Sequence, residues 1–495
     1  MDRVSKNIVI NEDLVFEKKS GNRSSFKLPE ISGELPAKNF LPENYLRDEI
    51  EDFPQLNEVE IARHFSRLSN YNYHLDLGLY PLGSCTMKYN PKLNERIASM
   101  REFTEIHPFT PYEHAQGILK ILKDLEDLLL EITGMDGITL QPTAGAHGEL
   151  TGMLLIRALL EYRGNPRKVV LIPDSAHGTN PASATLCGYK AITIKSDEKG
   201  CINLDDFKEK LTEDVACLML TNPNTLGIFE ENILEISKLL HENGSLLYMD
   251  GANFNAFMGK ARPGDMGVDV MHLNVHKTFS TPHGGGGPGA GPVAVKKELV
   301  PFLPLPRIEE RDGKYHLNFN GEKSIGKVAT FYGNVNVLIK TLAYILKLGS
   351  DGIREVSEMA VLNANYIRTK LKEILHLEYD TPTLHEVVFD DKFQEEYGIS
   401  TMDMAKRLLD KGFHPPTVYF PLIVHGALMI EPTETESKEE LDEFIKAFKE
   451  IVKEARENPK KLHRAPENLR RKRFDEVLAA RKPVLKWKKS DEGDK

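Results

Sequence analysis

The sequence predicts an α/β protein whose large domain holds a mainly parallel sheet and whose smaller C-terminal domain is α+β. Short apolar segments alternate with amphipathic helical patterns in the middle of the chain, which is typical of a parallel sheet covered by helices on both faces. The chain has 495 residues, more than one hydrophobic core usually supports, so two domains are expected. A long helical pattern over residues 335–348 would connect them.

The strands of the large sheet are predicted from short apolar segments, and its helices from apolar residues at helical spacing. Ligands of such sheets bind beyond the carboxyl ends of the strands, so functional residues are expected there. The predicted strands are Ile138–Gln141, Val169–Ile172, Ala191–Ile194, Cys217–Thr221, Ser245–Met249, Met271–Val275 and Gly291–Val295. The predicted helices are 115–133, 148–162 and 231–242.

Four parts are predicted along the chain. Turn signals and a short helix at 58–68 mark the first part, and helices at 353–375 and 437–456 with strand-like segments at 386–389 and 421–429 mark the third. The basic last part is interpreted as a solvated extension, with docking to an acidic partner as the alternative. The predicted boundaries are 1–112 for the N-terminal arm, 113–340 for the large domain, 341–455 for the small domain and 456–495 for the tail.

Composition argues against several classes of protein. A net charge of −10 argues against a nucleic-acid binder. No segment approaches the roughly 18 apolar residues of a membrane span, and the first ten residues lack the apolar stretch of a secretory signal. The four cysteines have no zinc-site spacing, which favours reduced thiols. A cytoplasmic protein without a membrane partner is therefore predicted.

Residues 141–148, Gln-Pro-Thr-Ala-Gly-Ala-His-Gly, lie between a predicted strand and a predicted helix. Small residues there let the backbone approach a ligand, and the free N–H groups of a helix start attract an anion. We therefore predict a phosphate seat at Ala144, Gly145 and Ala146. A plain strand-to-helix turn is the alternative, since the segment lacks the glycine pattern of a dinucleotide site or a P-loop.

Two further features follow strands. His177, in Asp-Ser-Ala-His-Gly-Thr-Asn-Pro, could lay its ring on a planar cofactor, although a helix-capping or core histidine is about equally compatible. Asp250, in Met-Asp-Gly-Ala252-Asn, ends a buried strand. A carboxylate there could keep a pyridine nitrogen protonated, so that the ring can absorb electrons from a breaking bond. A helix cap or a metal ligand is the alternative role for Asp250.

The fourth feature is Lys277, in Asn-Val-His276-Lys-Thr-Phe, followed by a glycine-rich run at 284–287. Burial of lysine is costly because desolvation disfavours its charged form, so a lysine at a strand end in apolar surroundings is a candidate imine-forming amine. A surface lysine is the alternative. The His-Gly-Gly-Gly string could suggest a lipase oxyanion loop, but no nucleophile elbow accompanies it. The spacing of 27 residues from Asp250 (277 − 250) leaves room for one crossover between neighbouring strands.

In this order the four features resemble the pyridoxal phosphate enzymes of fold type I, the aspartate aminotransferase fold. More narrowly, the chain resembles the P-proteins of the glycine cleavage system, glycine dehydrogenase (decarboxylating), over nearly its whole length. The strings that carry the resemblance are Leu82–Pro91, Gln141–Gly148, Asp174–Ser183, Asp250–Asn253, His276–Phe279, Phe331–Asn334, Gly412–Pro421 and Met429–Glu434.

The resemblance implies a Schiff base between Lys277 and the cofactor, decarboxylation of glycine, and transfer of the aminomethyl group to the lipoyl arm of H-protein. Only the catalytic half of the longer single-chain form is matched. That implies a first subunit, homologous but without the lysine, as partner in an α2β2 assembly. Another fold type I decarboxylase, an aminotransferase or a catalytically inactive structural subunit is the alternative.

The resemblance also assigns roles to individual residues. It implies that the ring stacks on His177 or, alternatively, His147, that Asn222 lies near the 3′-oxygen, and that His276 contacts the phosphate or helps proton transfer. It implies that the segment with Ser84, Cys85 and Thr86 lines the substrate entrance, and that Tyr332 and Asn334 reach a neighbouring chain's site. The cofactor-binding residues expected are Ala144, Gly145, Ala146, His177, Asn222, Asp250, Ala252, His276 and Lys277.

Overall fold

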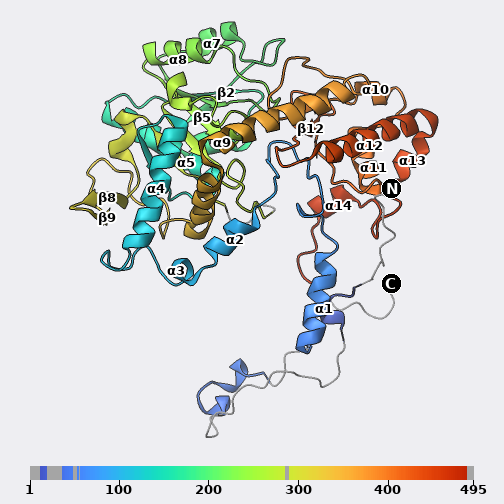
Figure 1. Cartoon of the computed structure of the whole chain (residues 1–495), viewed down its shortest axis with the longest axis horizontal. Helices are drawn as coiled ribbons and strands as arrows, with labels where there is room; N and C mark the ends of the chain where they lie inside the picture. The colour runs from blue at the N-terminus through green and yellow to red at the C-terminus, as the bar shows by residue number, and fades with distance from the viewer. Residues whose placement is uncertain (1–11, 19–35, 48–52, 55, 285–288, 488–495) are drawn as a thin grey trace. The chain divides into compact units, whose positions relative to one another are not determined.

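The computed structural model describes residues 12–18, 36–47, 53–54, 56–284 and 289–487 (Figure 1). By their internal contacts the residues form two units, Met1–Leu77 and Gly78–Lys495. In the first unit, α1 (Glu58–Ser69) begins at Asn57, whose side chain accepts from the Glu60 backbone N–H at 2.9 Å. The helix predicted at 58–68 is therefore confirmed.

The second unit contains a seven-stranded sheet in the order β1-β7-β6-β5-β4-β2-β3, in which β7 alone runs antiparallel to its neighbours. Every predicted strand of the large domain has its counterpart, with small shifts at the ends. The strands are β1 (Gly137–Thr139), β2 (Val169–Pro173), β3 (Lys190–Ile194), β4 (Val215–Thr221), β5 (Leu246–Gly251), β6 (Val270–Leu273) and β7 (Val293–Val295).

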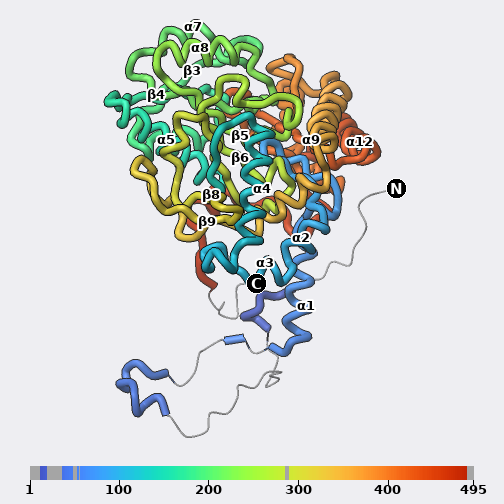
Figure 2. Tube along the Cα trace, turned by 60° about the vertical axis from the view of Figure 1, so that its left-hand side comes forward, coloured from blue at the N-terminus to red at the C-terminus, as the bar shows by residue number. Residues whose placement is uncertain are grey.

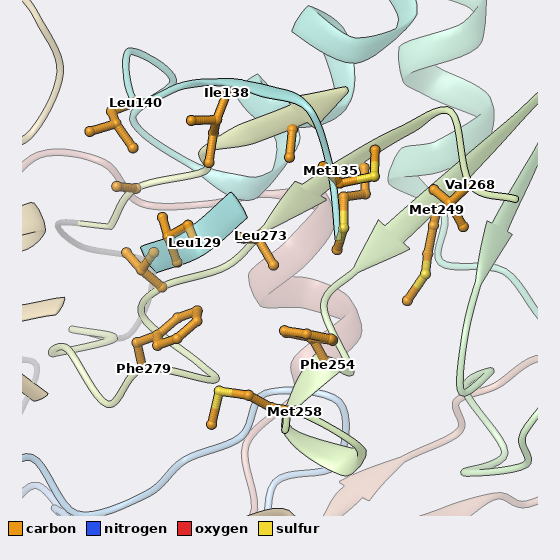
Figure 3. Packing of buried hydrophobic residues seen from close by; sticks show 14 of the residues in the cluster. Leu129, Met135, Ile138, Leu140, Met249, Phe254, Met258, Val268, Leu273 and Phe279 are labelled. Atoms are coloured by element: carbon orange, nitrogen blue, oxygen red, sulfur yellow. The ribbon is translucent and has the colours of Figure 1, made fainter. Parts of the chain in front are cut away.

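Helices cover both faces of this sheet because alternate strand residues are apolar on both sides. In β4, Leu218 and Leu220 pack in one core with α4, α7, α8 and α9, while Cys217 and Met219 pack in a second core with α5 and α6. Figure 3 shows part of the first core, where Leu273 of the sheet lies next to Leu129 of α4, and Met249 and Phe254 belong to the same cluster. The helices are α4 (Gln116–Thr133), α5 (Gly145–Tyr162), α6 (Thr179–Leu186), α7 (Leu204–Lys210), α8 (Ile233–Glu242) and α9 (Val335–Leu371).

Helix α9 runs from the large sheet to a smaller layer, and Figure 2 shows its orange tube beside α12. It is kinked at Gly349, whose φ of 64° and ψ of −174° are not helical. The kink accounts for the interruption between the two helical patterns predicted here, and glycine tolerates the positive φ. The smaller layer holds a three-stranded antiparallel sheet, β10 (Val387–Phe389), β12 (Leu428–Ile430) and β11 (Thr417–Val418), packed against α11 (Thr401–Asp410), α12 (Lys438–Glu457) and α13 (Pro459–Arg464).

The remaining described elements are short. They are η1 (Val15–Glu17), η2 (Ala37–Asn39) and η3 (Glu43–Tyr45) in the first unit, and α2 (Lys92–Ala98), α3 (Arg101–Thr104), η4 (Phe254–Ala256), η5 (Pro263–Met266), η6 (Lys297–Phe302), the hairpin β8 (Arg307–Arg311) and β9 (Lys314–Asn318), α10 (Lys392–Glu395) and α14 (Glu476–Arg481) in the second. Among the described helices, none combines the length and apolar character needed to cross a membrane.

The strand-like segment predicted at 421–429 is wrong over most of its length. Residues 421–426 form turns, and only its end enters β12. Pro421 cannot donate a ladder hydrogen bond, and Gly426 adopts a positive φ of 55°, so the backbone cannot continue as a strand. Helices α6, α7 and α11 and the hairpin β8–β9 were not predicted.

Tyr332 is buried in the fold, with 2% of its surface exposed, and its hydroxyl is 3.3 Å from the Glu126 carboxyl group of α4. Burial raises the pKa of Glu126 to about 8. Asn334, at the start of α9, donates to the Gly289 carbonyl. These two residues of the Phe331–Asn334 string therefore have partners within this chain.

The buried Glu126 predicts a pH dependence of stability. Because its folded-state pKa of about 8 lies above its ordinary value of 4.5, the folded state holds a proton that the unfolded state has lost. The free energy of unfolding should fall as pH rises from 4.5 to 8, by about 1.4 kcal/mol per pH unit from this group. In Glu126→Gln this part of the slope should be absent in urea titrations at several pH values. An unchanged slope would contradict the assignment.

Candidate active site

The four sequence features lie at one edge of the large sheet. Strands β1, β2, β5 and β6 point the same way. The segments at 141–148, 174–181 and 274–281 follow the carboxyl ends of β1, β2 and β6, and the segment at 250–253 begins with the last two residues of β5. Strands β5 and β6 are adjacent and parallel, with Asp250 paired to His272. The crossover predicted between Asp250 and Lys277 is therefore confirmed.

Helix α5 begins at this edge with uncapped backbone N–H groups. Its N-cap residue, Ala144, is extended (φ −157°, ψ 165°), and no side chain caps the helix. Ala144 and Ala146 are exposed, whereas Gly145 is buried against Asn274 of the segment after β6. An 18-residue helix with free N–H groups and a positive dipole end suits an anion such as phosphate.

Gly145 leaves no space for a side chain. A Cβ at this position would lie 2.7 Å from the Asn274 Oδ1 atom. Gly145→Ala is therefore expected to displace Asn274 and to weaken cofactor binding roughly 10–100-fold, because overpacking costs about 1–3 kcal/mol. Titrating the cofactor-free chain with pyridoxal phosphate measures this. The matched control is Gly117→Ala in α4, where an added Cβ meets nothing within 4 Å; equal losses in both variants would contradict the prediction.

Asp250 is 2% exposed and surrounded by donors. Its carboxylate accepts from the Ala252 backbone N–H at 2.9 Å and from the Asn180 amide at 3.1 Å. Burial favours its protonated form, but the opposing effects of His272, Asn180 and Lys277 are larger together and lower the pKa of Asp250. The group is therefore an anion at neutral pH, which suits a partner that carries a proton.

A buried tyrosine and histidine orient Asp250 from behind. His272 Nε2 is 3.2 Å from the Asp250 carboxylate, and the Tyr248 hydroxyl is 2.7 Å from His272 Nδ1. An ionised carboxylate only accepts, so in the neutral ring Nε2 carries the hydrogen and Nδ1 accepts from Tyr248. Gly148 and Gly152 of α5 make room for these side chains, since an added Cβ would lie 2.9 Å from the His272 Cβ atom and 2.5 Å from the Tyr248 ring.

Lys277 is half-buried, and its amine donates to the Ser84 carbonyl at 2.9 Å. Its backbone N–H donates to the Asn274 carbonyl, so the residue that limits space at Gly145 also begins the turn that carries the lysine. Burial and the charge of Lys277 lower the pKa of the neighbouring His276 to about 3, which leaves its ring neutral at neutral pH. Residues 285–288 of the glycine-rich run lie outside the described residues.

We call residues 83–88 the strap, because their hydrogen bonds join the smaller layer to the lysine. Ser84 and Thr86 have positive φ values of 57° and 46°. Ser84 and Thr86 donate backbone N–H bonds to Glu386 (2.7 Å) and Glu431 (2.9 Å), respectively. Burial raises the pKa of the Cys85 thiol to about 11, so it is not a thiolate at neutral pH.

Lys88, at the end of the strap, is 1% exposed. Its amine donates to the Glu434 carboxylate at 2.8 Å, to Asn255 at 2.8 Å and to the Thr278 carbonyl at 2.7 Å. Since Thr278 follows Lys277 directly, this buried ion pair fixes the turn of the lysine from the strap side. Sequence reasoning missed Lys88, Glu386 and Glu431 as site residues, although two of the family-like strings, Leu82–Pro91 and Met429–Glu434, contained Lys88 and Glu431.

The other predicted residues have these positions. His177 is exposed, accepts from the Thr179 backbone N–H at 3.2 Å, and lies edge-on to Phe420 with ring centroids 5.6 Å apart. Asn222 is fully buried and accepts from the Glu230 backbone N–H at 3.1 Å. His147 Nδ1 accepts from the Thr143 backbone N–H at 3.2 Å. In the segment after β2, it is Asn180, in the first turn of α6, that contacts Asp250.

Several buried polar atoms near the carboxyl ends of β4 and β6 lack a hydrogen-bond partner among the described residues. Within the described residues, hydrogen-bond partners are missing for the following side-chain atoms at this edge: Asn222 Nδ2, Asn274 Oδ1, His276 Nδ1, Thr278 Oγ1 and Thr281 Oγ1. Unsatisfied buried groups are costly and rare in native proteins unless a ligand meets them. Together with the anion seat and the Asp250 carboxylate, this set of donors and acceptors fits pyridoxal phosphate.

The fold and the edge that carries these residues define a pyridoxal phosphate enzyme of fold type I. The fold is similar to that of an inhibitor-bound glycine decarboxylase (P-protein), with a TM-score of 0.71, 21% identity, and coverage of 83% of this chain and 94% of that one. It is also similar to the glutamate decarboxylase of Lactobacillus brevis, with a TM-score of 0.63, 14% identity and coverage of 84% and 96%.

Sequence comparison narrows the class to one family. Residues 36–309 match the model "Glycine cleavage system P-protein", and residues 356–472 match "Glycine dehydrogenase, C-terminal domain". The probable glycine dehydrogenase (decarboxylating) subunit 2 of Caldanaerobacter subterraneus is 56% identical over 96% of this chain and 99% of its own length. That of Thermotoga maritima is 54% identical over 96% and 99%. The chain belongs to the glycine dehydrogenase (decarboxylating) subunit 2 family of P-proteins.

Proposed function

We propose that this chain decarboxylates glycine and transfers the remaining aminomethyl group to the lipoyl arm of H-protein. The observation that carries the proposal is the position of Lys277 and Asp250 at the carboxyl ends of adjacent strands, beside the open start of α5, in a chain of the glycine dehydrogenase family. The reaction balances: the carboxylate leaves as CO2, a carbon–sulfur bond forms, the disulfide of the lipoyl ring breaks, and its second sulfur takes up a proton.

Pyridoxal phosphate, when bound, supplies an aldehyde that condenses with amines and a ring that draws electrons from a breaking bond. The backbone N–H groups at Ala144–Ala146 would hold its phosphate, and Asp250 its ring nitrogen. Lys277 would hold the aldehyde carbon and, once glycine has replaced it, accept or return a proton. His177, Asn222 and Ala252 are proposed to line the ring, and His276 to contact the phosphate or to help proton transfer.

The strap is proposed to border the entrance for glycine. The Ser84 carbonyl accepts a hydrogen bond from the Lys277 amine, which brings the segment with Ser84, Cys85 and Thr86 next to that amine. The neutral Cys85 thiol would not compete with Lys277 as a nucleophile. We further propose a first subunit as partner, in an α2β2 assembly, and a cytoplasmic location. The subunit number in the relatives' names supports the first of these.

An exchange assay tests the proposal. The full chain, mixed with the first subunit and pyridoxal phosphate, should incorporate labelled bicarbonate into glycine only when lipoylated H-protein is present. A matched reaction contains H-protein that lacks the lipoyl group. Exchange that proceeds equally well without the lipoyl group would indicate a simple amino-acid decarboxylase and would overturn the proposal.

A further inference from the structure

Two buried carboxyl groups lie side by side beneath the strap. Glu386 precedes β10 and Glu431 follows β12, and these strands are antiparallel with Val387 paired to Ile430. A ring nitrogen of His385 and one oxygen of each carboxyl group lie within 4.8 Å of one another. Glu386 and Glu431 are 0% and 1% exposed, so the pair is removed from water.

Two carboxyl groups this close and this deeply buried cannot both be ionised at neutral pH, because like charges repel strongly where water is excluded. They therefore hold one proton between them, in the manner of a coupled pair. The pKa values agree: burial raises that of Glu386 well above its ordinary range and that of Glu431 to about 7.

Hydrogen bonds identify the member that carries the proton. Each carboxyl group accepts one backbone N–H bond, Glu386 from Ser84 at 2.7 Å and Glu431 from Thr86 at 2.9 Å. Glu431 also accepts from the Thr86 hydroxyl at 2.5 Å, a short contact typical of an ionised acceptor. The Ser84 hydroxyl is 3.2 and 3.3 Å from the two oxygens of Glu386, and a hydroxyl can also accept from a protonated carboxyl group. Glu386 is the protonated member and Glu431 the anion.

Lys277 is the cation that faces this pair. Burial lowers the pKa of His385 to about 3, so its ring is neutral, and neither ring nitrogen has a hydrogen-bond partner within the described residues. Lys88 is already paired with Glu434, and the Cys85 thiol is uncharged. The amine of Lys277 donates to the Ser84 carbonyl, and the backbone N–H of the same Ser84 donates to Glu386. Ser84 therefore connects the lysine to the pair.

We infer that Glu386 and Glu431 share a single proton and that the remaining negative charge, on Glu431, stabilises the positively charged form of the Lys277 nitrogen. The two glutamates are positioning residues that act through the strap and through their charge. A positively charged nitrogen makes the carbon bound to it more reactive toward an incoming amine, so the pair favours the exchange of Lys277 for glycine. The inference rests on the proposed role of Lys277 as the cofactor lysine.

The shared proton can be measured without the cofactor. Infrared spectra of the full cofactor-free chain at neutral pH should contain the band of a buried protonated carboxyl group that disappears in Glu386→Gln and persists in Glu431→Gln. Glu126 is a second buried carboxyl group that is protonated at neutral pH, and its band in the same part of the infrared spectrum is identified by its loss in Glu126→Gln. If neither Glu386→Gln nor Glu431→Gln removes a band, the pair does not share a proton and the inference is overturned.

The effect on the lysine is measured with pyridoxal phosphate bound. The absorbance midpoint for loss of the proton from the lysine–cofactor linkage should be nearly the same in wild type and Glu386→Gln, since Glu431 keeps its charge. In Glu386→Gln/Glu431→Gln the midpoint should fall by about one pH unit, because the stabilising anion is gone. Glu386→Gln and Glu386→Gln/Glu431→Gln differ only in whether residue 431 is a glutamate or a glutamine. Equal absorbance midpoints in these two variants would overturn the inference.

Circular dichroism melts of each variant check the fold, and the infrared result decides the inference if the double variant does not fold. A chain that shows no lysine–cofactor absorbance in any form would instead contradict the proposed function. The two failures are therefore distinguishable.

Discussion

Lys277→Ala is expected to abolish the visible absorbance of the chain with pyridoxal phosphate and to reduce glycine–bicarbonate exchange by at least about 10³-fold. The side chain supplies both the amine that holds the cofactor and a group that can move a proton, and loss of a positioned proton-transfer group alone costs about 10²–10⁴-fold. The amine lies 2.9 Å from the Ser84 carbonyl, with the strap on one side and the start of α5 nearby.

The matched control for this variant is Lys296→Ala. Lys296 follows β7, which runs antiparallel to its neighbours, and its amine donates to the Gly134 carbonyl 3.1 Å away. Its loss removes a lysine next to the same sheet without touching the site. Lys296→Ala should keep normal absorbance. A Lys277→Ala chain that keeps its absorbance and exchange would show that another lysine holds the cofactor.

Asp250→Asn is expected to lower the rate of decarboxylation by about 10²–10³-fold while cofactor binding persists. An amide keeps the size of the side chain and can still accept from the Ala252 N–H, but it has no negative charge to hold a proton on the ring nitrogen. Single-turnover release of CO2 from labelled glycine measures the rate, and absorbance titration measures the binding.

The control for Asp250→Asn is Asp269→Asn. Asp269 directly precedes β6, and its carboxylate accepts from the Leu247 N–H at 2.8 Å and from His241. It therefore lies at the amino ends of β5 and β6, opposite the carboxyl ends that carry the site. The change should affect stability and leave the decarboxylation rate of the folded chain as it was. A rate in Asp250→Asn equal to that of wild type would remove the ring-nitrogen role from Asp250.

Local patterns predicted much of the fold. Periodicity identifies the apolar strands, helix α4 before Gly134, and the two halves of α9, because the pattern that predicts each of them lies within one continuous segment of the sequence. The short helix α6 has little contrast between its faces, since Thr179, Asn180 and Pro181 open it, and tertiary contacts decide its conformation. The error at 421–426 has the same origin: apolar composition outweighed Pro421 and Gly426 in the prediction.

The residues of the site likewise fall into those that could be predicted from the sequence and those that could not. Residues at successive strand ends, such as Gly145, Asp250 and Lys277, could be found because parallel strands bring their ends together. The strap contacts could not, because Ser84 and Glu386 are 302 residues apart and meet only once the smaller layer has packed. Glutamates that are exposed in most proteins give no sequence signal of burial, so their role depends on the three-dimensional structure.

Reduction with borohydride followed by peptide mapping tests the central claim most directly. The full chain, loaded with pyridoxal phosphate and reduced, should carry one cofactor mass, on Lys277, and prior addition of glycine should decrease that labelling. Cofactor mass on a different lysine, or labelling of Lys277 that glycine does not decrease, would contradict the account.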